Sequence, residues 1–249
     1  MSAMRSWVFL RGLTRESRHW GDFIAQFQEA MPQDKIIPLD FPGNGQLHLQ
    51  RSPTAVAAMV EHCREQLTQA GLEPPYSLLA MSLGGMVAVD WAARYPREIA
   101  ANVLINTSMR PFSPFYERLR PANYWRLLGL ALRRTSPTEW EKAIRELTSN
   151  GETQDVLPRW LELRLQSPVS MGNALRQLWA AARFRAPRKP PAVPTLVLSS
   201  RADHLVSVNC SLALSRSWQC AVRLHAQAGH DLPLDDGPWV VQQVQDWLR

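Results

Sequence analysis

The sequence YSLLAMSLGG at residues 76–85 decides how the rest of the chain is interpreted. Its first half is a short apolar run typical of a buried strand, and its second half leads directly into a helical pattern. A serine on such a turn projects its hydroxyl away from the backbone, toward the positive end of the helix. The turn is strained, so the residues two before and two after Ser82 must be small, and Ala80 and Gly84 are. Ser82 is therefore a candidate nucleophile, although an ordinary strand-to-helix turn also favours small residues.

The segments around this turn alternate between strand and helix patterns. Short apolar runs predict strands over residues 7–10, 35–39, 76–80 and 101–106, and again over 195–199 and 221–225. Apolar residues at helical spacing predict helices over 17–31, 52–70 and 83–94, and again over 207–218 and 238–248. Such alternation with short connections indicates a parallel sheet covered by helices on both faces.

The alternation stops between residues 108 and 189, where no strand pattern occurs. Helices are expected instead over 115–134 with a break at Pro121, over 137–148, over 153–165 and over 169–185. Ser136 and Glu139 form a capping box at the start of the second helix. We therefore predict an α/β fold of about six parallel strands with an all-helical cap. Residues 1–107 and 190–249 form its core, and residues 108–189 form the cap.

Composition describes an ordinary soluble globular protein, with 249 residues, 45% apolar and 20% charged. The net charge of +6 is uneven, because residues 108–190 hold 15 Arg and Lys against 7 Asp and Glu. A solvated helix surface explains such an excess, and so does recognition of an acidic partner. The sequence holds no nucleic-acid module, so nucleic acid is not expected as a partner.

Three cysteines without metal-ligand spacing indicate a reducing compartment, with no disulfide framework and no metal site. The apolar run at residues 7–10 is too short for a signal-peptide core or a membrane span. We therefore expect a cytoplasmic protein that needs no metal or organic cofactor.

A serine nucleophile needs a histidine to take its proton and a carboxylate to orient that histidine. Reactive groups in parallel sheets gather at the carboxyl ends of the strands. Asp203 follows the strand at 195–199, and His230 lies just beyond the last strand. Asp231 is a weaker candidate, because adjacent residues in an extended loop point apart. The order Ser82, Asp203, His230 is the one expected for a hydrolase with a nucleophile elbow.

Four motifs together resemble the α/β-hydrolase superfamily, and most closely its small serine esterases with a helical cap. They are AMSLGG at residues 80–85, DFPGNG at 40–45, the loop around Asp203, and the pair Gly229-His230. Carboxylesterases and pimeloyl-acyl-carrier-protein methyl ester esterases share this plan. The resemblance implies that Ser82 is the nucleophile, His230 the general base and then acid, and Asp203 the orienting carboxylate. It also implies an oxyanion hole built from two backbone N–H groups, those of Leu83 and Leu13.

The sequence departs from the superfamily pattern after the first strand, where Arg11-Gly12 replaces the usual His-Gly. A neutral imidazole can accept a hydrogen bond and Arg11 cannot, so the loop that would provide the Leu13 N–H differs from the superfamily pattern. We expect Arg11 to place a cation near the pocket mouth. The tryptophans and leucines of the cap indicate an apolar pocket suited to an acyl chain. Arg11, Trp20 and Trp125 are the candidate pocket residues.

These observations predict a serine hydrolase that cleaves carboxylic esters or thioesters through an acyl-enzyme. A hydrolase of carbon–carbon bonds or a perhydrolase could use the same three residues. A binding protein that has lost catalysis is the alternative from another class, and Arg11 is its only support. The expected partners are a small ester or acyl substrate and, through the basic cap, an acidic acyl carrier.

Overall fold

A single six-stranded sheet forms the centre of the computed structural model, which describes residues 4–132, 135–151 and 155–249. The strands are β1 (Ser6–Leu10), β2 (Lys35–Leu39), β3 (Tyr76–Met81), β4 (Ile99–Ile105), β5 (Thr195–Ser200) and β6 (Ala221–His225). They lie in the order β2-β1-β3-β4-β5-β6, and every neighbouring pair is parallel. The predicted fold of about six parallel strands is confirmed.

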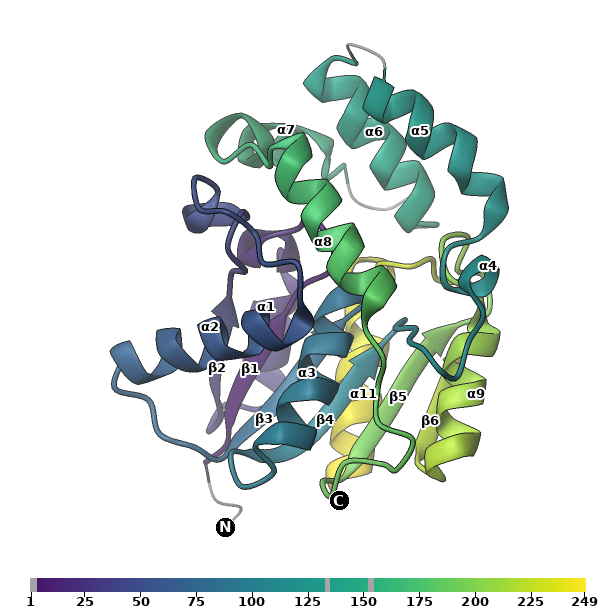
Figure 1. The fold of residues 1–249 in the computed structure, drawn as a ribbon. Helices are drawn as coiled ribbons and strands as arrows, with labels where there is room; N and C mark the ends of the chain where they lie inside the picture. Colours follow the sequence, from purple (N-terminus) through teal and green to yellow (C-terminus); the bar gives the residue numbers. More distant parts are fainter. Residues whose placement is uncertain (1–3, 133–134, 152–154) are drawn as a thin grey trace.

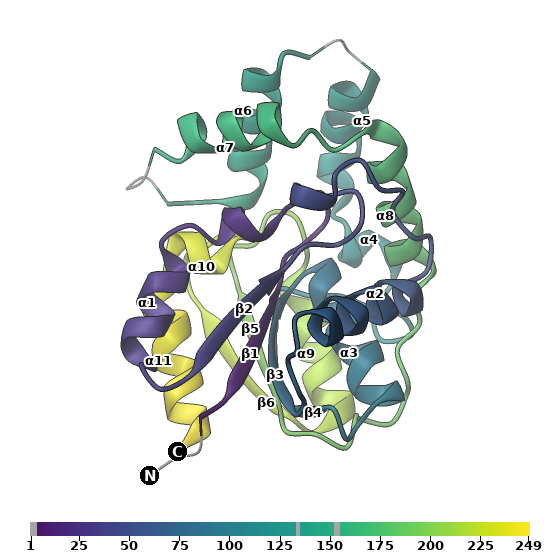
Figure 2. The ribbon, with the colours of Figure 1, turned by 90° about the vertical axis from the view of Figure 1, so that its left-hand side faces the viewer.

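Helices cover both faces of the sheet (Figure 2). On one face lie α2 (Val56–Gln69), α3 (Leu83–Arg94) and α9 (Val208–Trp218). On the other lie α1 (Phe23–Ala30) and α11 (Gly237–Leu248). Alternate residues of one strand enter different cores, so that Val8 packs toward α2 and α3 while Phe9 packs toward α1. This alternation explains why the central strands are apolar at most positions on both faces.

The cap segment, residues 108–189, lies between β4 and β5. It contains α4 (Phe115–Arg118), α5 (Tyr124–Leu132), α6 (Pro137–Thr148), α7 (Leu157–Gln166) and α8 (Met171–Arg183). Its described residues include no strand, apart from an isolated bridge between Arg110 and Arg185 that joins the two ends of the segment. Figure 1 shows α5, α6 and α7 above the sheet, on the side where its strands end. The capping box of Ser136 and Glu139 is present as predicted.

Two helix predictions need correction. The helix predicted over 17–31 is a 3-10 turn, η1 (Ser17–Trp20), followed by α1, because Gly21 between them has φ +55° and interrupts the helical backbone. The helix predicted to begin at Ser52 begins at Val56. The Ser52 hydroxyl donates to the carbonyl of Pro42 at 2.7 Å, so it is not available to cap α2. Residues 133–134 and 152–154, where two predicted cap helices end and begin, lie outside the described residues.

Polar side chains that are fully buried fix α8 to the core. Gln177 accepts a hydrogen bond from the backbone N–H of Thr14 at 2.8 Å and donates to the Asn44 side chain at 2.7 Å and to the Ser52 hydroxyl at 3.0 Å. Asn173, one turn earlier, accepts from the N–H of Ser52 at 2.9 Å. The cap helix α8 therefore holds the loops that follow β1 and β2.

Candidate active site

Ser82 occupies a sharp turn between β3 and α3 and has φ +54°, which is uncommon for a residue with a side chain. Its backbone N–H donates to the carbonyl of Ile105 at the end of β4, 3.0 Å away. The end of β1 passes so close that a β-carbon at Gly84 would lie 2.4 Å from the Leu10 carbonyl oxygen. The requirement for a small residue at position 84 is thus steric. The turn leaves the serine half-buried at the carboxyl edge of the sheet.

Asp203 and His230 meet directly. The Oδ2 atom of Asp203 lies 2.7 Å from His230 Nδ1, and both residues are almost completely buried. The other oxygen of Asp203 accepts the backbone N–H groups of Leu205 and Val206 at 2.8 and 2.9 Å. A carboxylate held by two backbone donors has a fixed orientation, and it fixes in turn the ring that it binds. Within the described residues the Ser82 hydroxyl forms no hydrogen bond, and such bonds are often long before substrate binds.

Asn106 connects the strand ends that carry these groups, and the sequence analysis did not single it out. The residue follows β4 with φ +44° and is buried. Its side-chain nitrogen donates to the His230 carbonyl at 2.8 Å, and its oxygen accepts the N–H of Ser200 at 2.9 Å. The available sequence signal was an asparagine at the carboxyl end of a buried strand. No acid stands at that strand end, so the position offered no partner for a histidine.

The resemblance implies an oxyanion hole built from the backbone N–H groups of Leu83 and Leu13. Leu83 is the first residue of α3, where an N–H has no acceptor within the helix. The N–H of Leu13 donates to no acceptor in the described parts of the chain, whereas that of Thr14 is used by Gln177. A β-carbon at Gly12 would lie 3.2 Å from the Cβ of Ser82, so this loop packs against the serine. Neither N–H group therefore has an acceptor among the residues that the structure describes, and both belong to segments next to Ser82.

Arg11 does not point out of the site as expected. Its side chain is only 2% exposed, and its two terminal nitrogens bind both carboxylate oxygens of Asp231, at 3.1 and 2.5 Å. The guanidinium also lies over the ring of Trp20, 4.7 Å from its centroid. The prediction of a cation near the pocket mouth is wrong, because Asp231 draws the charge inward. The argument that His230 and Asp231 point apart holds, since each binds a different partner.

A second buried cation connects the same loop to the cap. Arg15 donates to Glu141 of α6 at 2.7 Å and lies over the ring of Trp160 of α7. Its terminal nitrogen is also 3.0 Å from His19. Burial lowers the pKa of His19 well below its ordinary value of 6.5, and the nearby guanidiniums of Arg15 and Arg11 lower it further. His19 is therefore neutral at physiological pH in the folded protein.

The end of α6 packs directly on the histidine loop. The carbonyl of Thr148 accepts the N–H of Asp231 at 2.6 Å, and a β-carbon at Gly229 would lie 2.7 Å from that carbonyl. Asn150 donates to the carbonyls of Ala202 and Gln227, at 3.0 and 2.9 Å. One cap side chain therefore bridges the loop that carries Asp203 and the loop that carries His230.

Two predicted pocket residues have other environments. Trp125, on α5, is 81% exposed, which is the placement of a surface residue and not of a pocket wall, so this prediction is corrected. Trp20 is buried in the core cluster that includes Phe9 and Phe23, beneath Arg11. Its role there is packing against α1 and support of the arginine.

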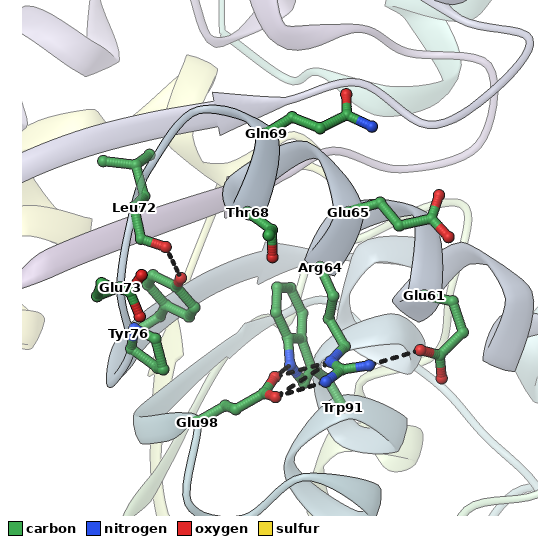
Figure 3. Close-up of a pocket in the computed structure, with 11 residues that line it drawn as sticks. Glu61, Arg64, Glu65, Thr68, Gln69, Leu72, Glu73, Tyr76, Trp91 and Glu98 are labelled. Atoms are coloured by element: carbon green, nitrogen blue, oxygen red, sulfur yellow. Dashed lines mark hydrogen bonds and ion pairs between the residues drawn. The ribbon is translucent and has the colours of Figure 1, made fainter.

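A surface hollow of about 390 Å³ lies away from this site, at the edge of the sheet where β3 begins (Figure 3). Arg64 crosses it and binds Glu98 and Glu61, each with a closest contact of 2.7 Å. Trp91 donates to Glu98 at 2.8 Å. These contacts join α2 to α3 and to the start of β4, so the hollow is lined by a structural ion-pair cluster.

In the described ranges no group of three His, Cys, Asp or Glu side chains could hold a metal ion. No helix there is long and apolar enough to cross a membrane.

Burial raises the pKa of the Cys210 thiol to about 11, which makes it a poor nucleophile at neutral pH.

The parallel sheet, the strained serine turn and the buried acid–histidine pair define a protein of the α/β-hydrolase type. A family model described as the alpha/beta hydrolase family matches residues 7–243, so the chain belongs to the α/β-hydrolase family. The family assignment supports hydrolysis as the general type of reaction that the protein catalyses.

The curated relatives are either low in identity or similar over only part of their length. A pimeloyl-[acyl-carrier protein] methyl ester esterase of Chromobacterium violaceum is 24% identical over 92% of this chain and 78% of its own. The uncharacterized protein YbdG of Bacillus subtilis and the bifunctional biotin-biosynthesis protein BioHC of Teredinibacter turnerae are each 30% identical. Those matches cover 31% and 41% of this chain but only 24% and 17% of the relatives.

Solved structures agree with the fold. A lipase described as putative, from Acinetobacter baumannii, superposes with a TM-score of 0.79 at 22% identity, over all of this chain and 84% of its own. A 2-hydroxy-6-oxo-6-phenylhexa-2,4-dienoate hydrolase from Rhodococcus gives 0.78 at 18% identity, over 99% and 91%. Identities this low establish the shared architecture, while the reaction must be argued from the site.

Proposed function

We propose that this protein is a serine hydrolase that cleaves carboxylic esters or thioesters through an acyl-enzyme. The observation that carries the proposal is the buried 2.7 Å contact between Asp203 and His230, on strand ends beside the strained Ser82 turn. A neutral imidazole whose Nδ1–H is held by a carboxylate presents Nε2 as a base. This is the arrangement that a serine hydroxyl needs to become a nucleophile.

The reaction would proceed in two halves. Ser82 Oγ attacks the ester carbonyl while His230 takes the hydroxyl proton, and the carbonyl oxygen becomes an oxyanion beside the N–H groups of Leu83 and Leu13. The histidine then gives its proton to the departing alcohol or thiol, leaving an acyl group on Ser82. Water attacks the acyl group with His230 again as base, which releases the acid and restores the serine. Removing one oxyanion donor typically costs about 10²–10³ in rate.

The substrate is proposed only as a class. The ester named for the Chromobacterium relative has an acyl chain on a carrier protein, and the basic cap of this chain supports an anionic partner of that kind. Charge reversal at Arg118 or Arg126 would not be a clean test of binding to an anionic partner, because both side chains already have partners within the cap. Arg118 donates to the carbonyls of Ala181 and Ala182, and Arg126 pairs with Glu146. Charge reversal there would disturb the cap itself.

The decisive experiment is a Ser82→Ala variant assayed on short p-nitrophenyl esters. We expect kcat/KM to fall by at least about 10³-fold, because the acyl-enzyme can no longer form. A fluorophosphonate probe should label the wild type at Ser82 and leave the variant unlabelled. Ser211→Ala on α9 is the matched control and should keep both activity and labelling. Ester turnover that survives in Ser82→Ala would exclude the serine as nucleophile.

A carbon–carbon hydrolase with the same residues is distinguished by substrate alone. Turnover of a dienoate ketone without turnover of any ester would favour that reaction, and loss of both in Ser82→Ala would show that they share the nucleophile. A wild-type protein that neither labels nor turns over either substrate would favour a binding protein.

A further inference from the structure

Over residues 171–179 the cap helix α8 has its polarity reversed, before the buried Ala180 and Ala181. Its buried face carries the amides Asn173 and Gln177, which are 6% and 0% exposed. Its solvent face carries four large apolar side chains that are 41–57% exposed: Met171, Leu175, Leu178 and Trp179. Their spacing of four, three and one residues places them on one stripe of the helix. A surface helix normally buries its apolar stripe, so this one offers an apolar surface to something outside the chain.

The stripe lies at the outside of the molecule. Both views of the ribbon place α8 along the surface of the protein (Figures 1 and 2). A shallow hollow of about 510 Å³ runs beside it and is lined by Leu175, Leu178 and Trp179 together with Thr54. The apolar side chains therefore form a ridge one helix wide with a shallow depression, and not the wall of an enclosed pocket.

The chain around this stripe has no acidic residue. From residue 163 to residue 202 the sequence contains no Asp or Glu and seven Arg or Lys. Four of these cations are exposed just after the stripe: Arg183, Arg185, Arg188 and Lys189. None of the four forms an ion pair within the described residues. The guanidinium of Arg183 lies 5.4 Å from the ring centroid of Trp179, so the cationic and apolar parts adjoin.

We propose that the outer face of α8 and the basic segment 183–189 form a docking surface for an anionic lipid bilayer. An exposed helix with Trp and Leu on one face and arginines beside them is suited to the boundary between headgroups and acyl chains. Unpaired cations near the surface of an anionic membrane add to this attraction. A folded protein partner would need a patch of about 800 Å² per side, whereas this ridge is a single helix wide.

The surface is separate from the catalytic groups, so this inference does not depend on the proposed ester hydrolysis. If both hold, docking would bring the enzyme to amphiphilic esters concentrated at a membrane. Vesicle binding and ester turnover are measured separately, and the failure of one leaves the other intact.

The test is co-sedimentation of the full chain with vesicles. We expect binding to phosphatidylcholine vesicles that contain phosphatidylglycerol, little binding to phosphatidylcholine alone, and weaker binding as salt is raised. A double variant, Leu175→Gln with Trp179→Gln, and a quadruple variant with the four exposed cations changed to Gln should each bind at least about tenfold more weakly. Leu49→Gln is the control. It changes an 89% exposed leucine in the loop after β2, outside the cap, and should bind as the wild type does.

Three outcomes would overturn the proposal. The first is no sedimentation of the wild type with anionic vesicles, and the second is equal loss in Leu49→Gln. The third is evidence that something other than a membrane occupies the surface. A dimer in ultracentrifugation that the double variant abolishes would assign the stripe to a second copy of the chain. Binding of an acidic acyl carrier that the quadruple variant abolishes would assign the cations to a protein. Circular dichroism and ester turnover of each variant would verify that it is folded.

Discussion

Arg11 and Asp231 flank the proposed catalytic groups from two sides. Arg11 comes just before the loop that provides the Leu13 N–H, and Asp231 comes just after His230. Asp203 binds the His230 ring, and the bidentate pair of Arg11 and Asp231 joins the two loops. We therefore expect Arg11 to position these loops without touching substrate.

Changing either member of this pair should lower both stability and kcat/KM, because the pair joins the loop that provides the Leu13 N–H to the loop that carries His230. Arg11→Met leaves Asp231 unpaired, and Asp231→Asn leaves Arg11 unpaired. The double variant should recover part of the stability that each single variant loses.

Each single variant also leaves a buried charge unpaired, at a cost of about 3–5 kcal/mol of folding free energy. Urea unfolding monitors that loss separately. Single variants that keep the wild-type stability and the wild-type kcat/KM would contradict this positioning role.

Elements differ in how far the sequence could predict them. The strands and the Ser82 turn were accessible, because apolar runs and small residues reflect local packing demands. Asp203 and His230 could also be predicted from the sequence, because the ends of parallel strands lie at one edge of the sheet. The partners of Arg11, Asn106 and Gln177 were not accessible, because each is separated from its contact by about 90 residues or more. Pairings at such distances depend on tertiary structure, which periodicity does not report.

The attachment of α8 through Gln177 should be measurable. Gln177→Leu would leave the Thr14 N–H and the Asn44 amide without their buried partner, and we expect a loss of about 2–4 kcal/mol of folding free energy. Urea unfolding gives the value. Gln46→Leu, at an exposed position, is the matched control and should change stability by less than about 0.5 kcal/mol. A small loss in Gln177→Leu would mean that α8 is held by its apolar contacts instead.

At the scale of the whole molecule, the buried cluster of Arg11, Arg15 and His19 makes stability depend on pH. In the unfolded chain His19 binds a proton near pH 6.5, whereas burial and the two guanidiniums keep it neutral in the folded protein. The unfolded state therefore holds more protons below that pH, and the folded protein should lose stability as the pH falls through 6.5.

The slope should approach about 1.4 kcal/mol per pH unit from this one group. His19→Gln should flatten the profile below pH 6.5, whatever its effect on stability at neutral pH. His204→Gln, at an exposed position, serves as the control and should keep the slope. Unfolding in urea at a series of pH values measures it, and an unchanged slope in His19→Gln would assign the effect to other groups.

The contact made by Asn150 bears on how such a protein can change over evolution. An insertion between two strands is usually the part of a fold that can be exchanged or trimmed while the core stays intact. Here the inserted segment supplies an amide that spans the Asp203 and His230 loops, in addition to the bridge that Asn106 of the core makes between Ser200 and His230. The cap is consequently not a free module. A chimaera that grafts another cap onto this core would keep the strands and the Asn106 bridge but lose the second tie between the two loops, unless the grafted segment brings that asparagine or an equivalent donor.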